Sequence, residues 1–210
     1  MFKFEQISGE LKKHIPFTFF GALTGILIMA VSSRIPAEAS LNIFYVFHPI
    51  HVVLSALVTA SMYEFHKCNV DKRKCSVWIL LLVGYAGSVG IATISDSIIP
   101  YLGEVLLDMP NREIHLGFIE KWWLVNPLAI AGVAIAYFRP STKFPHAGHV
   151  LLSTWASLFH IMTAAGLSLN WVSYVAIFFF LAVAVWLPCC ISDIAFPLLF
   201  VTDKAEQKNE

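Results

Sequence analysis

Residues 48–55 read HPIHVVLS, and nearly the same stretch returns at residues 146–153 as HAGHVLLS. A second pair follows in the same order, with ISDSIIPYL at 94–102 and ISDIAFPLL at 191–199. The first pair is separated by 98 residues and the second by 97, so both motifs recur at nearly one offset. Self-similarity at a fixed offset is the sequence signature of a repeated structural unit. We therefore expect a chain built from two related halves.

The composition indicates that both halves lie in a membrane. Of the 210 residues, 58% are hydrophobic and only 13% are charged, and the mean hydropathy is +0.71. Soluble domains usually have about 25% charged residues, so we expect the lipid bilayer as the main partner of this chain. Its 14 basic residues are balanced by 14 acidic ones. Because no net positive field results, we expect no nucleic-acid partner.

Six apolar stretches are long enough to cross the hydrocarbon core as helices, which takes about 20 residues. They are residues 15–33, 42–65, 76–107, 122–138, 147–165 and 171–201. The third and the sixth are too long for one straight span, and each carries an internal Ser-Asp and a proline. We expect both of these helices to be kinked or broken. The predicted fold is an all-α polytopic membrane protein with six transmembrane helices.

Three spans in each half force the second half into the membrane upside down relative to the first. We predict inverted three-helix repeats at residues 15–108 and 109–203, an amphipathic N-terminal segment at 1–14 and a polar tail at 204–210. Inverted repeats are a recurring architecture of secondary transporters, which bind their cargo between the repeats.

Basic residues set the expected orientation of the chain. With the N-terminus inside, the cytoplasmic segments carry eleven Lys and Arg residues. The external loops carry three, which are Arg34, Arg112 and Lys121. Short cytoplasmic loops have such an excess of basic residues. We therefore predict an integral protein of the cell or inner membrane with cytoplasmic N- and C-termini.

The repeated motifs carry histidines at helical spacing. Residues three apart lie on one face of a helix, so the two histidines of each HxxH sequence are neighbours. Two imidazoles one turn apart can bind a divalent transition metal, but such sites generally have a further ligand, often a carboxylate. The aspartate of the repeated ISD motif supplies it. The predicted metal ligands are His48, His51 and Asp96 in the first half and His146, His149 and Asp193 in the second.

Counting along the spans places the members of each set at one depth. The second span starts outside near residue 43 and the third starts inside near residue 77, so His51 and Asp96 both reach the outer third at about 1.5 Å per residue. The same count places the second set at the inner face. We therefore expect two His-His-Asp sites, one toward each side. The serines expected beside them, as further ligands or as partners of the ligands, are Ser55, Ser95, Ser153 and Ser192.

These sites favour a transporter or channel for a divalent transition metal, with zinc as the first choice. An ionisable side chain inside a span is costly and marks a functional site. Protons are the second candidate cargo, alone or coupled to the metal, because Asp and His side chains can both carry them. The sequence leaves both a monomer and a homo-oligomer open.

Three alternatives remain. In an intramembrane zinc-dependent hydrolase, a His-His-Asp set would hold zinc and a water molecule, although the chain has no HExxH motif. In a b-type haem carrier, His51 would face His160 and His66 would face His149. The helix rise, however, separates His51 from His66 by about 22 Å along one span and His149 from His160 by about 16 Å along the other, so the two pairs do not match in height. In a purely structural reading, the His and Asp side chains only join packed helices by hydrogen bonds. We favour transport over all three.

Overall fold

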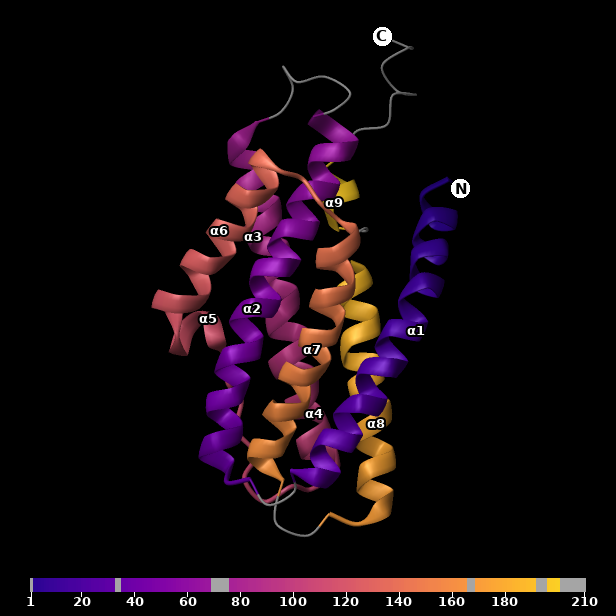
Figure 1. The fold of residues 1–210 in the computed structure, drawn as a ribbon, viewed down its shortest axis with the longest axis vertical. Coiled ribbons are helices and arrows are strands. Elements are labelled where there is room, and N and C mark those ends of the chain that lie inside the picture. The colour runs from indigo at the N-terminus through magenta and orange to yellow at the C-terminus, as the bar shows by residue number, and fades with distance from the viewer. Residues whose placement is uncertain (1, 33–34, 69–75, 166–168, 192–195, 201–210) are drawn as a thin grey trace.

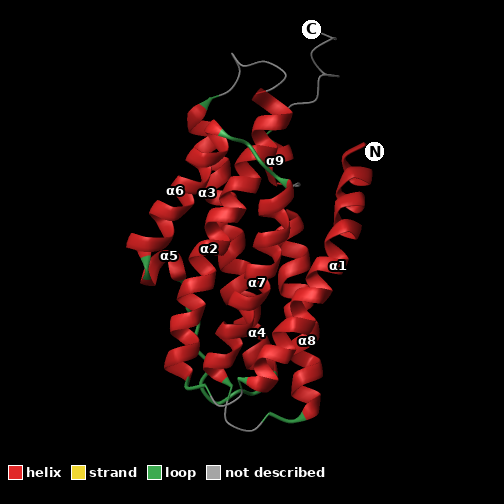
Figure 2. Cartoon of the chain, in the orientation of Figure 1, coloured by secondary structure: helices red, strands yellow, loops and turns green. Residues whose placement is uncertain are grey.

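The structure is a computed structural model that describes residues 2–32, 35–68, 76–165, 169–191 and 196–200. Within these ranges every regular element is a helix and no strand occurs (Figure 2). The prediction of an all-α protein is confirmed.

Long helices form the first half of the chain. It consists of α1 (Phe2–Val31), α2 (Ala37–Tyr63) with a π-helical turn η1 (Glu64–Cys68) at its end, and α3 (Val77–Thr93), which continues through the π-helical turn η3 (Ile94–Ile98) into α4 (Ile99–Leu106). Where a kink or break was expected in the third span, the helix continues through the π-helical turn η3. The second half consists of α5 (Gly117–Glu120), α6 (Trp122–Phe138), α7 (Lys143–Ala164), α8 (Trp171–Cys190) and α9 (Phe196–Leu199).

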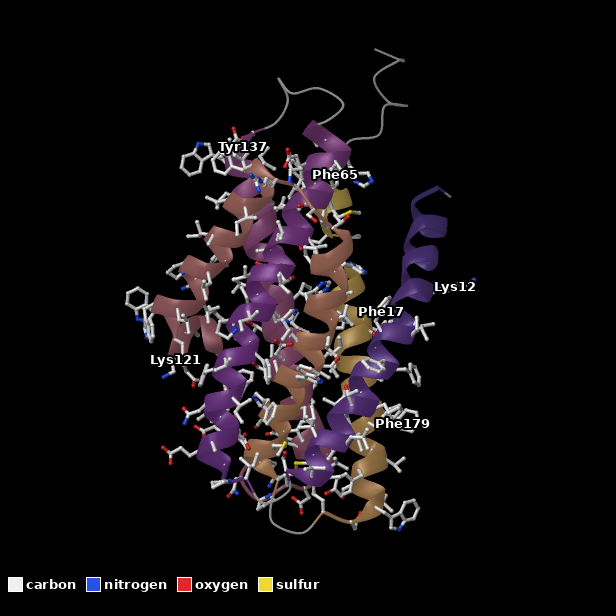
Figure 3. All side chains as sticks on the ribbon, in the orientation of Figure 1. Lys12, Phe17, Phe65, Lys121, Tyr137 and Phe179 are labelled. Atoms are coloured by element: carbon white, nitrogen blue, oxygen red, sulfur yellow. The ribbon has the colours of Figure 1, made fainter. Side chains whose placement is uncertain are left out.

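Three of the described helical stretches are long and apolar enough to cross a membrane: Ala37–Lys67, Val77–Leu106 and Trp171–Cys189. Two shorter apolar stretches accompany them, Ile15–Val31 and Trp122–Phe138. Large apolar side chains lie on the outside of the bundle, such as Phe17, Tyr137 and Phe179, labelled in Figure 3, which are between 46% and 58% exposed. A soluble monomer rarely exposes so much apolar surface. These features are those of an integral membrane protein.

Helix α7, at the predicted fifth span, is not among these apolar candidates. It lies at the centre of the bundle, in contact with α2, α1, α8 and α4 (Figure 1). Six of its polar side chains are buried, each 6% exposed or less: His149, Ser153, Thr154, Ser157, His160 and Thr163. Polar residues inside a membrane almost always face the interior of the bundle. Tertiary packing therefore accounts for the lower hydropathy of this helix.

Helices α2 and α7 run antiparallel through the centre of the bundle (Figure 1). Around them, α1 packs on α7 and α8, and α6 packs on α2 and α3. The approach of α6 is close, because a Cβ atom at Gly132 would lie 2.5 Å from the carbonyl oxygen of Val53. Small residues allow helix backbones to come this near to each other.

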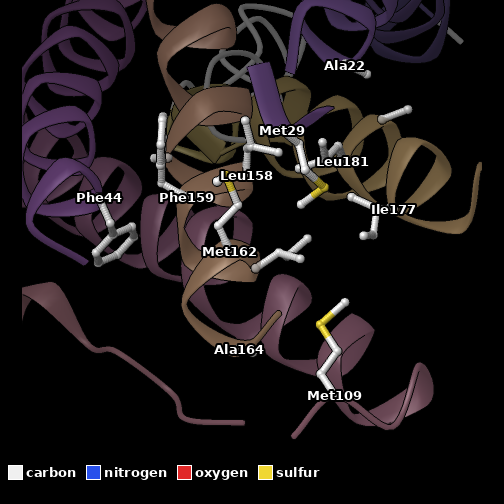
Figure 4. Close-up of a cluster of buried hydrophobic side chains, with 13 residues drawn as sticks. Ala22, Met29, Phe44, Met109, Leu158, Phe159, Met162, Ala164, Ile177 and Leu181 are labelled. Carbon is white, nitrogen blue, oxygen red and sulfur yellow. The ribbon is translucent and has the colours of Figure 1, made fainter. Parts of the chain in front are cut away.

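Apolar packing joins α1, α7 and α8 around one end of the polar centre. The side chains of Met29, Leu158, Ile177 and Leu181 belong to this buried cluster (Figure 4). Phe44 from α2 also belongs to it and is fully buried. At this end of the bundle, apolar side chains therefore surround the polar residues of α2 and α7.

Candidate metal centre

One carboxylate joins two histidines inside the bundle. Nδ1 of His48 lies 2.9 Å and Nδ1 of His51 lies 2.7 Å from Oδ2 of Asp96. None of the three side chains is more than 1% exposed. Their ligand atoms all lie within 4.8 Å of one another, so the group can hold a metal ion. The predicted meeting of the first histidine pair with Asp96 is confirmed.

Local sequence explains how Asp96 reaches the histidines. Pro100 follows four residues later and has no N–H to donate to the carbonyl of Asp96, which disturbs the regular α-helix. The amide of Ile99 instead bonds the carbonyl of Ile94, five residues back, and this closes the π-helical turn η3. Single π turns inside α-helices frequently occur at functional sites. His48 and His51 share one face of α2 because three residues make nearly one helical turn.

The second oxygen of Asp96 is held by serines from both halves of the chain. Oδ1 accepts hydrogen bonds from the hydroxyls of Ser95 and Ser153, each at 2.7 Å. One turn further along α7, Ser157 donates to the main-chain carbonyl of Ser95 at 2.9 Å. Two donors on each oxygen satisfy an ionised carboxylate away from water. Of the four serines predicted beside the sites, Ser95 and Ser153 thus contact the carboxylate directly.

The second histidine pair lies against the first cluster. The rings of His51 and His149 stack with 5.8 Å between their centroids and 9° between their planes. Nδ1 of His149 lies 3.2 Å from the carbonyl oxygen of Pro145, so this nitrogen carries the hydrogen. His146 touches His149 with the ring planes at 76° and the centroids 5.3 Å apart. The other predicted members of the second set, Asp193 and Ser192, lie outside the described residues.

The two histidine pairs meet inside the bundle, whereas the depth count expected them near opposite sides. That count started the second span near residue 43, but α2 begins at Ala37. Six additional residues move His51 about 9 Å further from the start of its helix. The local association of His48, His51 and Asp96 was therefore predicted correctly, and the distance between the two pairs was not.

A residue without a side chain covers His48. A Cβ atom at Gly117 would lie 2.5 Å from Cδ2 and 2.6 Å from Nε2 of His48. That nitrogen is buried and has no hydrogen-bond partner. The short helix α5 therefore closes this side of the cluster, and only glycine leaves the imidazole its place.

A second ionisable pair lies on the other side of Phe44. The Phe44 ring stacks on His48 at 5.1 Å and meets the ring of His160 edge-on at 5.4 Å. Nδ1 of His160 lies 2.7 Å from Oε1 of Glu104, and both side chains are fully buried. His160 was expected only as a possible haem ligand, and Glu104 was not predicted as a functional residue. The signal for it was a glutamate inside an apolar span.

The segment before α6 carries a further acidic group. Glu120 accepts hydrogen bonds from the Tyr45 hydroxyl and, at 2.8 Å, from the amide of Leu116. Nδ1 of His115 lies 3.3 Å from the same carboxylate. Partial burial acts to raise the pKa of Glu120, but these hydrogen bonds and the nearby His115 outweigh it and hold the pKa below its ordinary value. The network ties this segment to α2.

No protein-family model, curated protein or solved structure matches the chain. The structure therefore defines the class of protein by itself. It is a helical protein with the apolar helices of a membrane protein. Within its described part, it encloses one His-His-Asp cluster that can hold a metal ion.

Proposed function

We propose that this chain is an integral membrane transporter or channel for a divalent transition metal, and that His48, His51 and Asp96 bind the metal on its way across the bilayer. The observation that carries the proposal is the convergence of two imidazole nitrogens and one carboxylate oxygen in a fully enclosed place. Imidazole and carboxylate together suit zinc and its neighbours in the first transition series. Zinc is our first choice.

The contacts of Asp96 with the two histidines are compatible with binding of a divalent metal ion. In the structure, Oδ2 of Asp96 occupies the position between the two Nδ1 atoms. A metal ion needs the lone pairs of its ligands, so protons leave or move within the imidazoles when the ion enters. Ser95 and Ser153 would keep the carboxylate oriented through its other oxygen. Metal and proton movements are thereby linked in the same site.

Helix packing supports the proposal that residues 15–108 and 109–203 are inverted repeats. An offset of 98 residues makes α1 equivalent to α6, α2 to α7 and α3 to α8. The contact of α1 with α7 and α8 then corresponds to that of α6 with α2 and α3. The contact of α4 with α7 likewise corresponds to that of α9 with α2. A pseudo-twofold axis between α2 and α7 produces such pairs of contacts.

The same relationship supports a second site formed by His146, His149 and Asp193. Pro197 follows Asp193 by four residues, as Pro100 follows Asp96. Ser55 is the equivalent of Ser153 and is buried on α2. Rocking of the two halves about their shared centre would expose the sites in turn.

Specific contacts weigh against the alternatives. The haem reading requires His51 and His160 to face a porphyrin, but His51 contacts Asp96 and His149, and His160 contacts Glu104. A hydrolase requires a general base beside the metal. The buried glutamate nearest in sequence to Asp96, Glu104, lies eight residues further along and bonds to His160 instead.

The test is elemental analysis of the detergent-purified protein after loading with Zn²⁺ and removal of free metal. We expect the wild type to retain zinc and His51→Ala and Asp96→Asn to lose the ion of the first site. The matched control is His66→Ala, because Nδ1 of His66 bonds only the carbonyl of Met62 at 2.8 Å, outside the cluster. An absorbance spectrum of the same samples would show a haem band if that alternative were correct.

Vesicles separate a transporter from a protein that merely holds metal. The wild type, reconstituted with a zinc-sensitive dye inside, should let Zn²⁺ enter, and His51→Ala should not. A folded wild type that retains no Zn²⁺, Co²⁺ or Mn²⁺ would refute the proposal. Retention of zinc without any flux would refute transport and leave the enzyme and structural readings.

A further inference from the structure

Glu104 and His160 form a buried ionisable pair that the metal cluster does not use. Glu104 lies on α4 and His160 on α7, with 2.7 Å between Oε1 and Nδ1. Both side chains are 0% exposed. The Phe44 ring stands between His160 and His48, in contact with both. A phenyl ring cannot relay a proton, so the pair is chemically separate from the metal cluster.

The hydrogen bonds define where the protons of this pair lie. The main-chain N–H of His115 donates to Nε2 of His160 at 3.3 Å, so Nε2 is an acceptor. The imidazole hydrogen therefore sits on Nδ1 and is donated to Oε1 of Glu104. His160 is neutral in this arrangement and offers no positive charge to the carboxylate.

The other oxygen of Glu104 is the informative atom. Oε2 is buried and has no hydrogen-bond partner. An ionised carboxylate with one oxygen unsatisfied, away from water and from any cation, is strongly disfavoured. Asp96 shows the contrast within the same protein, because each of its oxygens accepts two hydrogen bonds. A proton bound to Glu104 removes the charge.

We propose that Glu104 is a proton-binding site, that His160 delivers its proton, and that this proton moves in exchange with the metal. In the delivery step, an N–H bond forms at Nε2 of His160, the N–H bond at Nδ1 breaks, and an O–H bond forms on Glu104. One proton is transferred and no charge is left on His160. The part of the proposal that concerns exchange rests on the proposed function, whereas proton binding by Glu104 does not.

A route leads from His160 to the outside of the bundle. The His115 amide must release Nε2, and at 3.3 Å its bond is longer than the usual 2.9–3.0 Å. The ring of His115 lies 5.4 Å from that of His160, and its Nδ1 lies 3.3 Å from Oε2 of Glu120. Glu120 is 39% exposed and can exchange protons with water. The other titratable groups along this route are Tyr45, Glu113, whose charge acts on Tyr45, and Lys121, whose Nζ lies 5.2 Å from the Tyr45 ring.

The same two helical elements connect Glu104 with the metal cluster. Asp96 and Glu104 lie eight residues apart on η3 and α4, and their partners Ser153 and His160 lie seven residues apart on α7. Protonation of Glu104 changes how α4 holds α7, and the same contact between these elements positions Asp96. A proton can therefore influence metal release without touching the metal ligands.

The pair occurs in only one half of the chain. At the offset of 97 that relates the two ISD motifs, the equivalent of Glu104 is Val201, and at the offset of 98 that relates the two HxxH motifs, the equivalent of His160 is Met62. The proposed proton site thus breaks the symmetry of the repeats. Such an asymmetry is what a directional exchange of proton and metal requires.

Infrared difference spectroscopy of the purified protein tests proton binding without any metal. A pH jump should reveal the C=O stretch of a buried carboxylic acid in the wild type. The band should be absent in Glu104→Gln and present in Asp96→Asn and in Glu38→Gln, an exposed glutamate on α2. His160→Gln should shift the pH at which the band disappears. No band in the wild type, or the same band in Glu104→Gln, would overturn the proposal.

The same experiment includes a control for correct folding of the Glu104 variant. Gln retains an oxygen that can accept the hydrogen bond of His160, and gel filtration reports whether the variant is intact. If Glu104→Gln does not fold, Glu104→Asp replaces it, and the band should then move in frequency. An unmoved band in Glu104→Asp would count against Glu104.

Exchange is tested in vesicles that contain a pH-sensitive dye. Zn²⁺ uptake by the wild type should be accompanied by proton efflux, and in Glu104→Gln this efflux per zinc ion taken up should fall, although the variant still retains zinc in elemental analysis. Equal efflux from both proteins would refute exchange through Glu104. If the wild type binds no zinc, the proposed function fails and the infrared band still decides whether Glu104 binds a proton.

Discussion

The imidazole rings of His51 and His149 stack on each other at the contact of α2 and α7, 5.8 Å apart and 9° from parallel. The two residues stand 98 positions apart, the same offset that separates HPIHVVLS from HAGHVLLS. In the proposed inverted repeats they are equivalent residues, so the pseudo-twofold axis passes between their rings. A charge bound at one ring therefore acts directly on the other.

This stacking yields a prediction about metal stoichiometry. His51→Phe keeps an aromatic ring but removes a ligand of the first cluster, so the ion of that cluster should be lost. His149→Phe should retain it, because His48, His51 and Asp96 form a complete set of three ligands. Elemental analysis of both variants measures the difference. Equal losses in the two variants would show that the four histidines hold a single ion together.

Asp96 should be the most sensitive position for stability. In Asp96→Asn, the amide NH₂ group faces donors where the carboxylate oxygen accepted two hydrogen bonds. Removing one partner of a buried charged group costs about 3–5 kcal/mol of unfolding free energy. The control is Asp108→Asn, since the Asp108 side chain is 91% exposed and surface changes stay within about 0.5 kcal/mol. Chemical denaturation in mixed micelles measures the unfolding free energy of both variants. Similar free energies for Asp96→Asn and Asp108→Asn would contradict the prediction.

Ser153 should affect metal affinity as well as stability. Ser153→Ala removes one of two donors on Oδ1 of Asp96, which costs about 1.5–3 kcal/mol for a bond to a charged group. Loss of such a partner should weaken zinc binding about 10- to 100-fold. Ser157→Ala, one turn away, loses bonds to main-chain carbonyls only and should cost about 1 kcal/mol without changing affinity. Zinc titration measures the affinity of the two variants. Equal affinities would exclude a role of Ser153 in zinc binding.

Two glycines should respond to alanine with opposite signs. Gly117→Ala places a methyl group within 2.6 Å of the buried His48 ring, and such overpacking costs about 1–3 kcal/mol. Gly90→Ala on α3 meets no atom within 4 Å and should stabilise the helix by about 0.5–1 kcal/mol. The unfolding midpoints of both variants and the wild type, measured in the same detergent, test this difference. A Gly117→Ala protein as stable as the wild type would show that α5 does not press on His48.

Acid should weaken the attachment of the segment before α6. Because the folded protein lowers the pKa of Glu120, the ionised carboxylate stabilises the fold at pH values above its ordinary pKa of 4.5, and this stabilisation is lost as the pH falls below that value. Glu120→Gln should therefore show a smaller loss of stability between pH 6 and pH 3, values chosen to bracket that pKa. Tyr45→Phe removes a hydrogen bond to Glu120 and should flatten the pH profile in the same direction. Parallel profiles for wild type and both variants would contradict this.

Some features of the site follow from local pattern alone. His48 and His51 share a face because helix geometry is periodic, and Pro100 disturbs the helix four residues after Asp96 whatever surrounds it. Long apolar stretches become helices because the backbone must satisfy its own hydrogen bonds away from water. The helices and the His48-His51-Asp96 association were predictable for these reasons.

Other features depend on how helices cross. The contact of Ser153 with Asp96, the stacking of His51 on His149 and the Glu104–His160 pair all join residues more than 50 positions apart. Their meeting depends on where each helix begins and how it is rotated about its axis. No spacing in the chain encodes a rotation, because side chains from several helices set it together by packing.

The sequence by itself determined a helical protein with the composition of a membrane protein, two related halves of sequence and the first set of candidate ligands, since hydrophobicity, helical period and repetition are properties of the chain. Only the tertiary structure decided that the two histidine pairs touch, that a serine from the second half holds the aspartate of the first, and that Glu104 is enclosed with an oxygen left unsatisfied. These outcomes arise from packing between helices that are distant in sequence. A start of α2 a few residues earlier than expected is enough to bring the first histidine pair into contact with the second.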